Sequence, residues 1–376
     1  MSNSFRLFRV RGIDIRIHIT FPLILIWAAL SFGVFNGQGL EGATFGIVVM
    51  LMLFAIIVLH ELGHSVAAQN FGVSVKEIIL LPIGGVAQLE RIPENPFQEF
   101  VIAIAGPLVN FVIAVIMILV APLLGLEIGA FTLENLSSNL GEFTLPSVFG
   151  YVFVSNIFIG VFNLLPAFPM DGGRVLRALL ATKLEYSRAT AIAVVVGRAF
   201  AWLLGLWGFL SGSFFAILIA FFIYSGAGQE GRFVQLRSIL GDMIVEQAYT
   251  RKAQVLAPTT KLKEAVQLTL TSFQANFAVC DGDRLVGLMT YPKLVEALDR
   301  LSVDRPVSEV MLTDFISVSP EDKLFDTQQR MMEQKLEAVP VAKQGRYLGL
   351  ITSQDIGEAY RLLSLYPGQT LPTAAV

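Results

Sequence analysis

Six apolar runs of 16 to 27 residues occupy most of the first 230 residues of this chain. A helix of about 20 residues crosses the ~30 Å hydrocarbon core of a bilayer, so runs of this length predict membrane spans. Charged residues are correspondingly scarce there: Asp, Glu, Lys and Arg account for 24 of residues 1–230 but for 33 of the remaining 146. We therefore expect an α-helical polytopic membrane protein with about six spans, followed by a soluble part. The expected spans are 18–36, 43–69, 99–124, 147–166, 190–210 and 212–227.

The loops between these runs indicate an orientation. Those near 37–42, 125–146 and 211–213 contain no Lys or Arg, whereas the N-terminal segment and the alternate loops contain several. Because basic residues are enriched in cytoplasmic loops, we expect an integral protein of the cell inner or plasma membrane, with both termini and the soluble part in the cytoplasm. The first run lacks a small-residue cleavage site after it and is expected to be retained. A net charge of −3 without a basic block gives no reason to expect nucleic-acid binding.

A short stretch between the second and third runs is neither a span nor an ordinary polar loop. Residues 80–89 read Leu-Leu-Pro-Ile-Gly-Gly-Val-Ala-Gln-Leu, two short apolar runs around a Gly-Gly pair. This pattern predicts a tight, membrane-associated β-hairpin. Irregular backbone at membrane depth requires protein or a watery cavity around it. An interfacial linker is the alternative.

The last 130 residues contain two segments of similar design. Each has an amphipathic helix, a short strand, a turn with Gly, a second strand and a second helix, with a spacing of about 60 residues that fits tandem α/β units sharing a buried face. The expected strands are 278–280, 285–289, 338–342 and 347–351. We expect a membrane domain at 1–230, a linker at 231–245, the two units at 246–300 and 301–365, and a tail at 366–376.

A His-Glu-Leu-Gly-His motif closes the second apolar run at residues 60–64. His60 and His64 share one face of a helix, so both imidazoles reach one metal ion. Glu61, beside that face, is placed to hydrogen-bond a metal-bound water. A chance match or a surface ion pair is the alternative, but residues 47–59 contain no charge, and a Glu at the end of such a run is costly to bury unless it is paired or functional. The motif therefore predicts a metal site.

Catalytic zinc usually has three protein ligands and a water, so one ligand is still needed. The single cysteine, Cys280, lies in the soluble part, and it excludes an intrachain disulfide framework and a four-cysteine zinc site. Asp171 ends the fourth run within Pro-Ala-Phe-Pro-Met-Asp-Gly-Gly, on the same expected cytoplasmic side as His64. The prolines unwind the helix end and the glycines permit close approach, so this carboxylate is the candidate third ligand. A surface Asp-Gly turn is the alternative.

The His-Glu-Leu-Gly-His helix, the segment 168–173 and the Gly-Gly hairpin between them resemble the site-2 protease family of intramembrane zinc metalloproteases, peptidase family M50. The resemblance implies that His60, His64 and Asp171 bind one Zn2+ and that Glu61 is the catalytic base. It also supports a role for Gly84 and Gly85 in holding substrate backbone, for which strand addition is a physically reasonable mode.

Two asparagines are candidate substrate-binding residues. Asn110, in the third run, is expected to position substrate or an oxyanion, with an interhelical hydrogen bond as the alternative. The family's late motif is often Asn-Pro-Asp-Gly-like, whereas this chain has Pro169-Met-Asp-Gly. This departure leaves Asp171 as the ligand and makes Asn163 a candidate on the substrate side.

The soluble part resembles a pair of CBS domains. Residues 349–355, Gly-Leu-Ile-Thr-Ser-Gln-Asp, are similar to the CBS nucleotide signature, which implies that Thr352 lies near the phosphates and Asp355 on the ribose of ATP, ADP or AMP. In the first repeat Lys293 stands in place of the Asp, so at most one such ribose contact is expected. The alternative is a purely structural pair, or a dimerising pair that makes the chain a homo-oligomer through its CBS domains.

Together these features predict an intramembrane zinc metalloprotease that cleaves membrane-spanning or membrane-anchored proteins, with the CBS pair binding an adenine nucleotide. Its expected partners are the bilayer, a membrane protein substrate and that nucleotide. A CBS-regulated membrane transporter or channel is the alternative. It would require inward charges along a path or related halves of the bundle, and the sequence has neither.

Overall fold

The computed structural model describes residues 4–365 except 83, 90–92, 94, 128–141, 252 and 273. The chain divides into two compact units, Met1–Gly231 and Arg232–Val376, each with its own hydrophobic core. Most of the expected outer loop at 125–146 and the whole expected tail at 366–376 lie outside the described residues.

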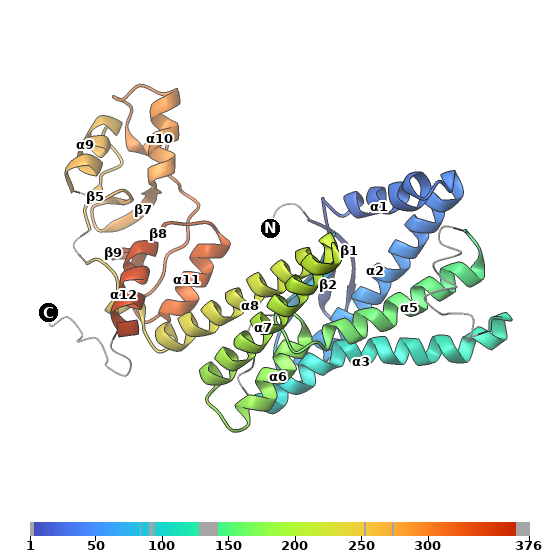
Figure 1. The fold of residues 1–376 in the computed structure, drawn as a ribbon. Coiled ribbons are helices and arrows are strands. Elements are labelled where there is room, and N and C mark those ends of the chain that lie inside the picture. The colour runs from blue at the N-terminus through green and yellow to red at the C-terminus, as the bar shows by residue number, and fades with distance from the viewer. Residues whose placement is uncertain are drawn as a thin grey trace. The chain divides into compact units, whose positions relative to one another are not determined.

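Within the described part of the first unit, five helices are long and apolar enough to cross a membrane. They pack side by side, with α3 against both α2 and α5 and with α7 against α8 (Figure 1). Large apolar side chains such as Trp202, Leu203 and Leu206 remain exposed on their outer faces, as expected for contact with lipid. The five are α2 (Gly39–Asn70), α3 (Pro96–Val120), α5 (Leu145–Asn163), α7 (Tyr186–Ser211) and α8 (Phe214–Leu240).

The first expected span, 18–36, forms a shorter helix. The α-helix α1 (Pro22–Ala29) runs directly into the π-helical segment Leu30–Phe35. Fourteen helical residues extend about 21 Å, which is less than the hydrocarbon thickness. The prediction of a polytopic helical membrane protein is confirmed, with five full-length helices and this short one among the described residues.

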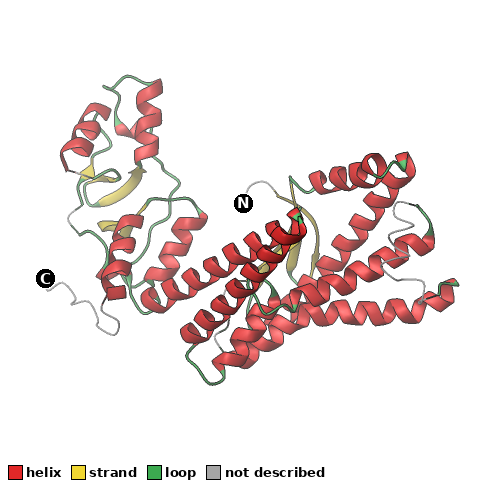
Figure 2. Ribbon diagram, in the orientation of Figure 1, coloured by secondary structure: helices red, strands yellow, loops and turns green. Residues whose placement is uncertain are grey.

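A four-stranded sheet lies beside α2, drawn in yellow in Figure 2. Its order is β1-β2-β3-β4, with β2 and β3 parallel and the outer pairs antiparallel. The β3–β4 pair is the hairpin predicted at 80–89, whereas the sequence gives no indication of the β1–β2 pair. Ile13, Ile15 and Ile78 are fully buried and pack the sheet against α2. The strands are β1 (Ser4–Val10), β2 (Ile13–His18), β3 (Val75–Leu81) and β4 (Gly84–Leu89).

The second unit is the predicted tandem of α/β repeats around one five-stranded sheet of order β5-β6-β7-β9-β8. Each repeat contributes an antiparallel strand pair at the positions expected from sequence, and helices flank both pairs. The strands are β5 (Val255–Leu256), β6 (Phe277–Asp281), β7 (Arg284–Met289), β8 (Ala338–Lys343) and β9 (Arg346–Thr352). The helices are α9 (Leu262–Ser272), α10 (Tyr291–Arg300), α11 (Leu324–Glu333) and α12 (Ser353–Leu365).

The segment expected as a linker, 231–245, is helical as far as Leu240, because α8 continues without a break. Phe233, Leu236 and Leu240 recur at helical spacing and pack into the core of the second repeat. The helix then stops at Gly241. The helix therefore continues beyond the apolar run 212–227, because apolar residues still recur on one of its faces.

Candidate metal centre

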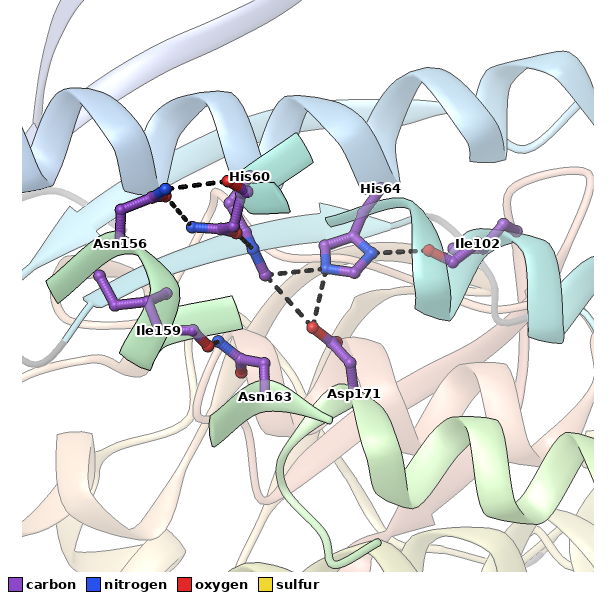
Figure 3. A network of polar contacts seen from close by, with 8 residues as sticks. His60, His64, Ile102, Asn156, Ile159, Asn163 and Asp171 are labelled. Carbon is purple, nitrogen blue, oxygen red and sulfur yellow. Dashed lines mark hydrogen bonds and ion pairs between the residues drawn. The ribbon is translucent and has the colours of Figure 1, made fainter. Parts of the chain in front are cut away.

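The two histidines of the motif project from one face of α2 into the bundle, where both are almost completely buried (Figure 3). Their Nε2 atoms are 3.1 Å apart. The helix α3 crosses α2 at this level, and glycines permit the close approach. A Cβ on Gly106 of α3 would overlap the ring of His64, and a Cβ on Gly63 would come within 2.9 Å of the Ala105 carbonyl. Small residues at this crossing therefore bring α3 directly behind the imidazoles.

The orientation of His64 is determined by a backbone group. Its Nδ1 lies 2.6 Å from the carbonyl oxygen of Ile102. A carbonyl only accepts, so Nδ1 must be the donor, and a neutral His64 presents a lone pair on Nε2. The lone pair faces the centre of the bundle.

His60 is fixed in the same way through a chain of two buried asparagines. The side-chain amide of Asn156 donates to the backbone carbonyl of Asn110 at 2.8 Å, which turns its oxygen towards the Asn110 amide nitrogen, also 2.8 Å away. The Asn110 oxygen is thereby left facing His60 Nδ1 at 2.5 Å. His60 Nδ1 must donate, so a neutral His60 likewise presents its lone pair on Nε2, directed into the site.

Asp171 reaches the histidines from the first position of α6 (Asp171–Ala181). Its Oδ2 lies 3.2 Å from His60 Nε2 and 3.1 Å from His64 Nε2. The turn before it is tight: a Cβ on Gly172 would overlap the backbone carbonyls of residues 164 and 165. Glycine at this position therefore lets the chain double back and direct the carboxylate into the bundle.

The three groups fit a metal ion. Two nitrogen lone pairs and a carboxylate oxygen repel one another at 3.1–3.2 Å unless a cation lies between them. Ligand atoms about 2.0–2.1 Å from a tetrahedral zinc ion are about 3.3 Å apart, close to these separations. The same three residues form a metal-capable cluster among the described residues. Both histidines also have the hydrogen-bonded Nδ1 that is typical of metal-bound imidazole.

Glu61 lies one residue along α2, beneath the edge strand of the sheet. A Cβ on Gly85 of β4 would stand 2.8 Å from the Glu61 Cγ and 3.1 Å from a methyl group of Ile57. The neighbouring Gly84 has a φ of +138°, a conformation that favours glycine. The hairpin glycines thus bring the β4 backbone directly over Glu61.

The two candidate substrate-binding asparagines, Asn110 and Asn163, have different hydrogen-bond partners. We expected Asn110 to hold substrate, with an interhelical hydrogen bond as the alternative; it is fully buried, and both ends of its amide bind His60 and Asn156. Asn163, at the end of α5, donates to the carbonyl of Ile159 at 2.9 Å, and Figure 3 shows it on the Asp171 side of the cluster.

In the second unit, Thr352 and Asp355 bind each other. The Thr352 amide and hydroxyl both donate to the Asp355 carboxylate at 2.8 Å, and the Asp355 amide donates back to the Thr352 hydroxyl at 3.1 Å. This is the reciprocal arrangement of a capping box at the start of α12. In the first repeat, the Thr290 hydroxyl caps α10 by accepting from the Lys293 amide, without an acidic partner.

Sequence reasoning did not find Asn156. The available signal was an amide in the middle of an apolar helix, which usually has a hydrogen-bonding reason to be there. Its partner lies on another helix, 46 residues away in the chain, so the role follows only from the packing of α3 against α5.

Comparison with known proteins gives matches to both units. The family model for peptidase family M50 matches residues 48–129 and 123–204, and the CBS domain model matches residues 307–361. A zinc metalloprotease of Methanocaldococcus jannaschii is 33% identical over 367 residues, covering 97% of this chain and 98% of that protein.

Solved structures are similar to each part. A site-2 protease from M. jannaschii is 40% identical over 61% of this chain and 95% of that chain, with a TM-score of 0.45. The structure of CBSX2 in complex with AMP is 21% identical over 32% of this chain and 98% of that chain, with a TM-score of 0.30.

Proposed function

Because the chain belongs to peptidase family M50, the site-2 protease family of zinc metalloproteases, we propose that it cleaves membrane-spanning or membrane-anchored proteins within the bilayer. The observation that carries the proposal is the buried set of three inward-facing acceptors on His60, His64 and Asp171. These are the proposed ligands of one Zn2+. Membership of a peptidase family weighs against the transporter or channel alternative.

Peptide hydrolysis at this site requires a base, and Glu61 is the proposed one. A zinc ion held by the three ligands would lower the pKa of a bound water towards ~7 and polarise the scissile carbonyl. Glu61 takes the proton of the attacking water and returns it to the leaving amine. Two features support this role: Glu61 follows the proposed ligand His60 directly in α2, and β4 covers it.

The edge of the sheet supports a mode of substrate binding. Among the described strands β4 pairs with β3 alone, so its second edge is available for an extended peptide. Gly85 brings the β4 backbone over Glu61, so substrate backbone paired to the Gly84–Gly85 edge would lie near that carboxylate, and Asn163 is the proposed polar contact on the Asp171 side. Adding substrate as a strand presents its peptide bond in extended form, as attack on the carbonyl requires.

The CBS repeats are the proposed site of an adenine nucleotide. The Asp355 Oδ2 accepts from Thr352, whereas among the described residues its Oδ1 has only a long contact of 3.5 Å with the Thr250 hydroxyl. That oxygen remains able to accept from a ribose hydroxyl. The basic loops support a cytoplasmic location for this unit and for both termini.

The Glu61→Gln variant tests the mechanism. Glutamine keeps the size of the side chain but does not take up a proton, so cleavage should be abolished while the protein keeps about one zinc per chain. Membrane proteomes of cells producing the wild type or the variant should differ by accumulation of an uncleaved substrate. The control is Glu41→Gln, an exposed position at the other end of α2. Retained proteolysis by Glu61→Gln would contradict the proposed base.

A further inference from the structure

The last long helix of the membrane unit packs against the segment that carries Asp171. Ile223 of α8 lies in one core with Ala167 and Met170, and Ala227 lies in another with Phe168. Between them, a Cβ on Gly226 would stand 2.6 Å from Pro169, two residues before the proposed ligand. One face of α8 therefore forms the wall against which the Asp171 turn rests.

Arg177 adds a polar connection on the other side of Asp171. It lies on α6, six residues after the ligand, and its side chain is fully buried. The guanidinium donates to Glu99 of α3 at 2.8 Å through Nε and to Glu230 of α8 at 2.5 Å through Nη1. It also lies 4.9 Å from the ring centre of Phe168, in the turn before Asp171. A single cation thus connects both flanks of Asp171 to two other helices.

The same face of α8 carries all of these contacts. Ile223, Gly226, Ala227 and Glu230 are three or four residues apart, which is the spacing of one helical face.

We propose that Arg177 is a positioning residue for Asp171: by pairing with Glu99 of α3 and Glu230 of α8, it holds α6 in place and thereby sets the position of the carboxylate and the affinity of the site for zinc. Glu230 and the wall at Gly226 lie on one face of α8. Both act on the backbone that directs the carboxylate, while α2 and α3 hold the two histidines independently. The inference rests on the proposed zinc site, because Asp171 is a ligand there.

Cobalt(II) reports ligand geometry through its visible absorption, so the first test compares cobalt-loaded full-length variants. Glu230→Gln breaks the ion pair with Arg177, and Gln229→Glu alters the neighbouring exposed position as a control. The first should change the cobalt spectrum and lower zinc affinity, measured by chelator competition, by up to about tenfold. This is the lower end of the cost of losing a group bonded directly to a ligand, because Arg177 contacts Phe168 and acts on Asp171 through the turn. The control should match the wild type. An unchanged spectrum and affinity in Glu230→Gln would overturn the role of Arg177.

A second variant keeps the role of Arg177 testable where Glu230→Gln fails to fold. Glu99→Gln removes the other ion-pair partner of Arg177 and should change the cobalt spectrum and zinc affinity in the same direction. Unchanged values in this variant would also overturn that role. If the wild type binds neither metal, the zinc site itself fails, which is a separate outcome.

Discussion

At the scale of single residues, two backbone carbonyls determine what the histidines can do. The Ile102 carbonyl accepts from His64, and the Asn110 carbonyl orients Asn156, which in turn orients the Asn110 side chain towards His60. Because a carbonyl has no hydrogen to give, the direction of every bond in the chain is fixed. A neutral imidazole at either position therefore carries its lone pair on Nε2, the nitrogen that faces the other two groups.

This arrangement predicts a graded loss of zinc. Asp171→Ala removes a proposed ligand and should abolish stoichiometric zinc binding. Asn156→Ala leaves all three ligands and should weaken affinity by about 10- to 100-fold, since it frees the Asn110 amide that orients His60. Zinc content and chelator competition on the purified proteins measure both effects. His18→Ala is the control, because His18 pairs with Thr20 away from the cluster. Full zinc affinity in Asp171→Ala would indicate a different third ligand.

The single cysteine offers a test in the second unit. Cys280 lies in β6 with 5% of its surface exposed, and burial, assisted by the nearby charge of Asp283, raises the pKa of its thiol. A raised pKa leaves less thiolate at a given pH, so maleimide should react slowly with the native protein at pH 8 and rapidly after unfolding.

A Ser302→Cys change in a Cys280→Ser background provides the exposed comparison, since Ser302 is on the surface. Equal labelling rates for the two native proteins would show that the β6 strand opens readily.

At the scale of elements, glycines allow helices and strands to approach the residues of the proposed reaction centre closely. Gly106 lets α3 approach the histidine rings, Gly172 turns Asp171 inward, and Gly85 brings β4 over Glu61. Each position lacks room for a Cβ against a side chain of the proposed reaction centre or its supporting backbone. At these three glycines, backbone atoms pack directly against side chains or backbone of a neighbouring element, where side chains would ordinarily pack against one another.

Gly85→Ala should separate catalysis from metal binding. The added methyl group would stand 2.8 Å from Glu61, so either β4 or the carboxylate must shift. A displacement of about 1 Å at a reacting group costs on the order of 100-fold in rate, while zinc content should remain that of the wild type. Cleavage of a membrane substrate in proteoliposomes measures the effect. Val86→Ala, at the next and exposed position, should retain activity; equal loss in both would point to general damage to the hairpin.

Element boundaries were predictable where a local pattern defined them. The repeated strand pairs and the Gly-Gly hairpin follow from alternation and turn residues. The extension of α8 to Leu240 escaped prediction because its polar and apolar residues no longer form a continuous hydrophobic run. The β1–β2 pair was also not predicted. Its arginines interrupt the apolar pattern, and its buried face forms only where the strands pack against α2.

At the scale of the whole molecule, the chain joins an M50 peptidase unit to a CBS unit. The Thr352–Asp355 pair is compatible with two roles, a helix cap and a nucleotide contact. The capping box by itself explains why the two residues bind each other, so their arrangement does not favour either role. The corresponding Thr290 and Lys293 lack the acidic partner. The two repeats therefore differ at the position of Asp355, where the first repeat has Lys293 and so lacks a carboxylate that could accept a hydrogen bond from a ribose hydroxyl.

Calorimetry on the full-length protein should detect binding of ATP, ADP or AMP. Asp355→Asn keeps an acceptor for the helix cap but removes the charge, and it should weaken binding about tenfold or more, since a hydrogen bond to a charged group contributes about 1.5–3 kcal/mol. Lys293→Ala, at the matching position of the first repeat, should leave affinity unchanged. No heat with any of the three nucleotides would favour a structural or dimerising role for the pair.

The sequence by itself determined the membrane class, the tandem α/β repeats and the pairing of His60 with His64, because each depends on local spacing: apolar run length, a 60-residue repeat and histidines one turn apart. Asp171 was a candidate because of its expected side of the membrane and the family resemblance. Tertiary structure alone decided which atoms of these residues face one another. Asn156, Gly106 and Arg177 act on partners 42 to 78 residues away in the chain. Their roles arise when helices pack, since a hydrogen bond or a close backbone contact depends on distance in space and leaves no local pattern in the sequence.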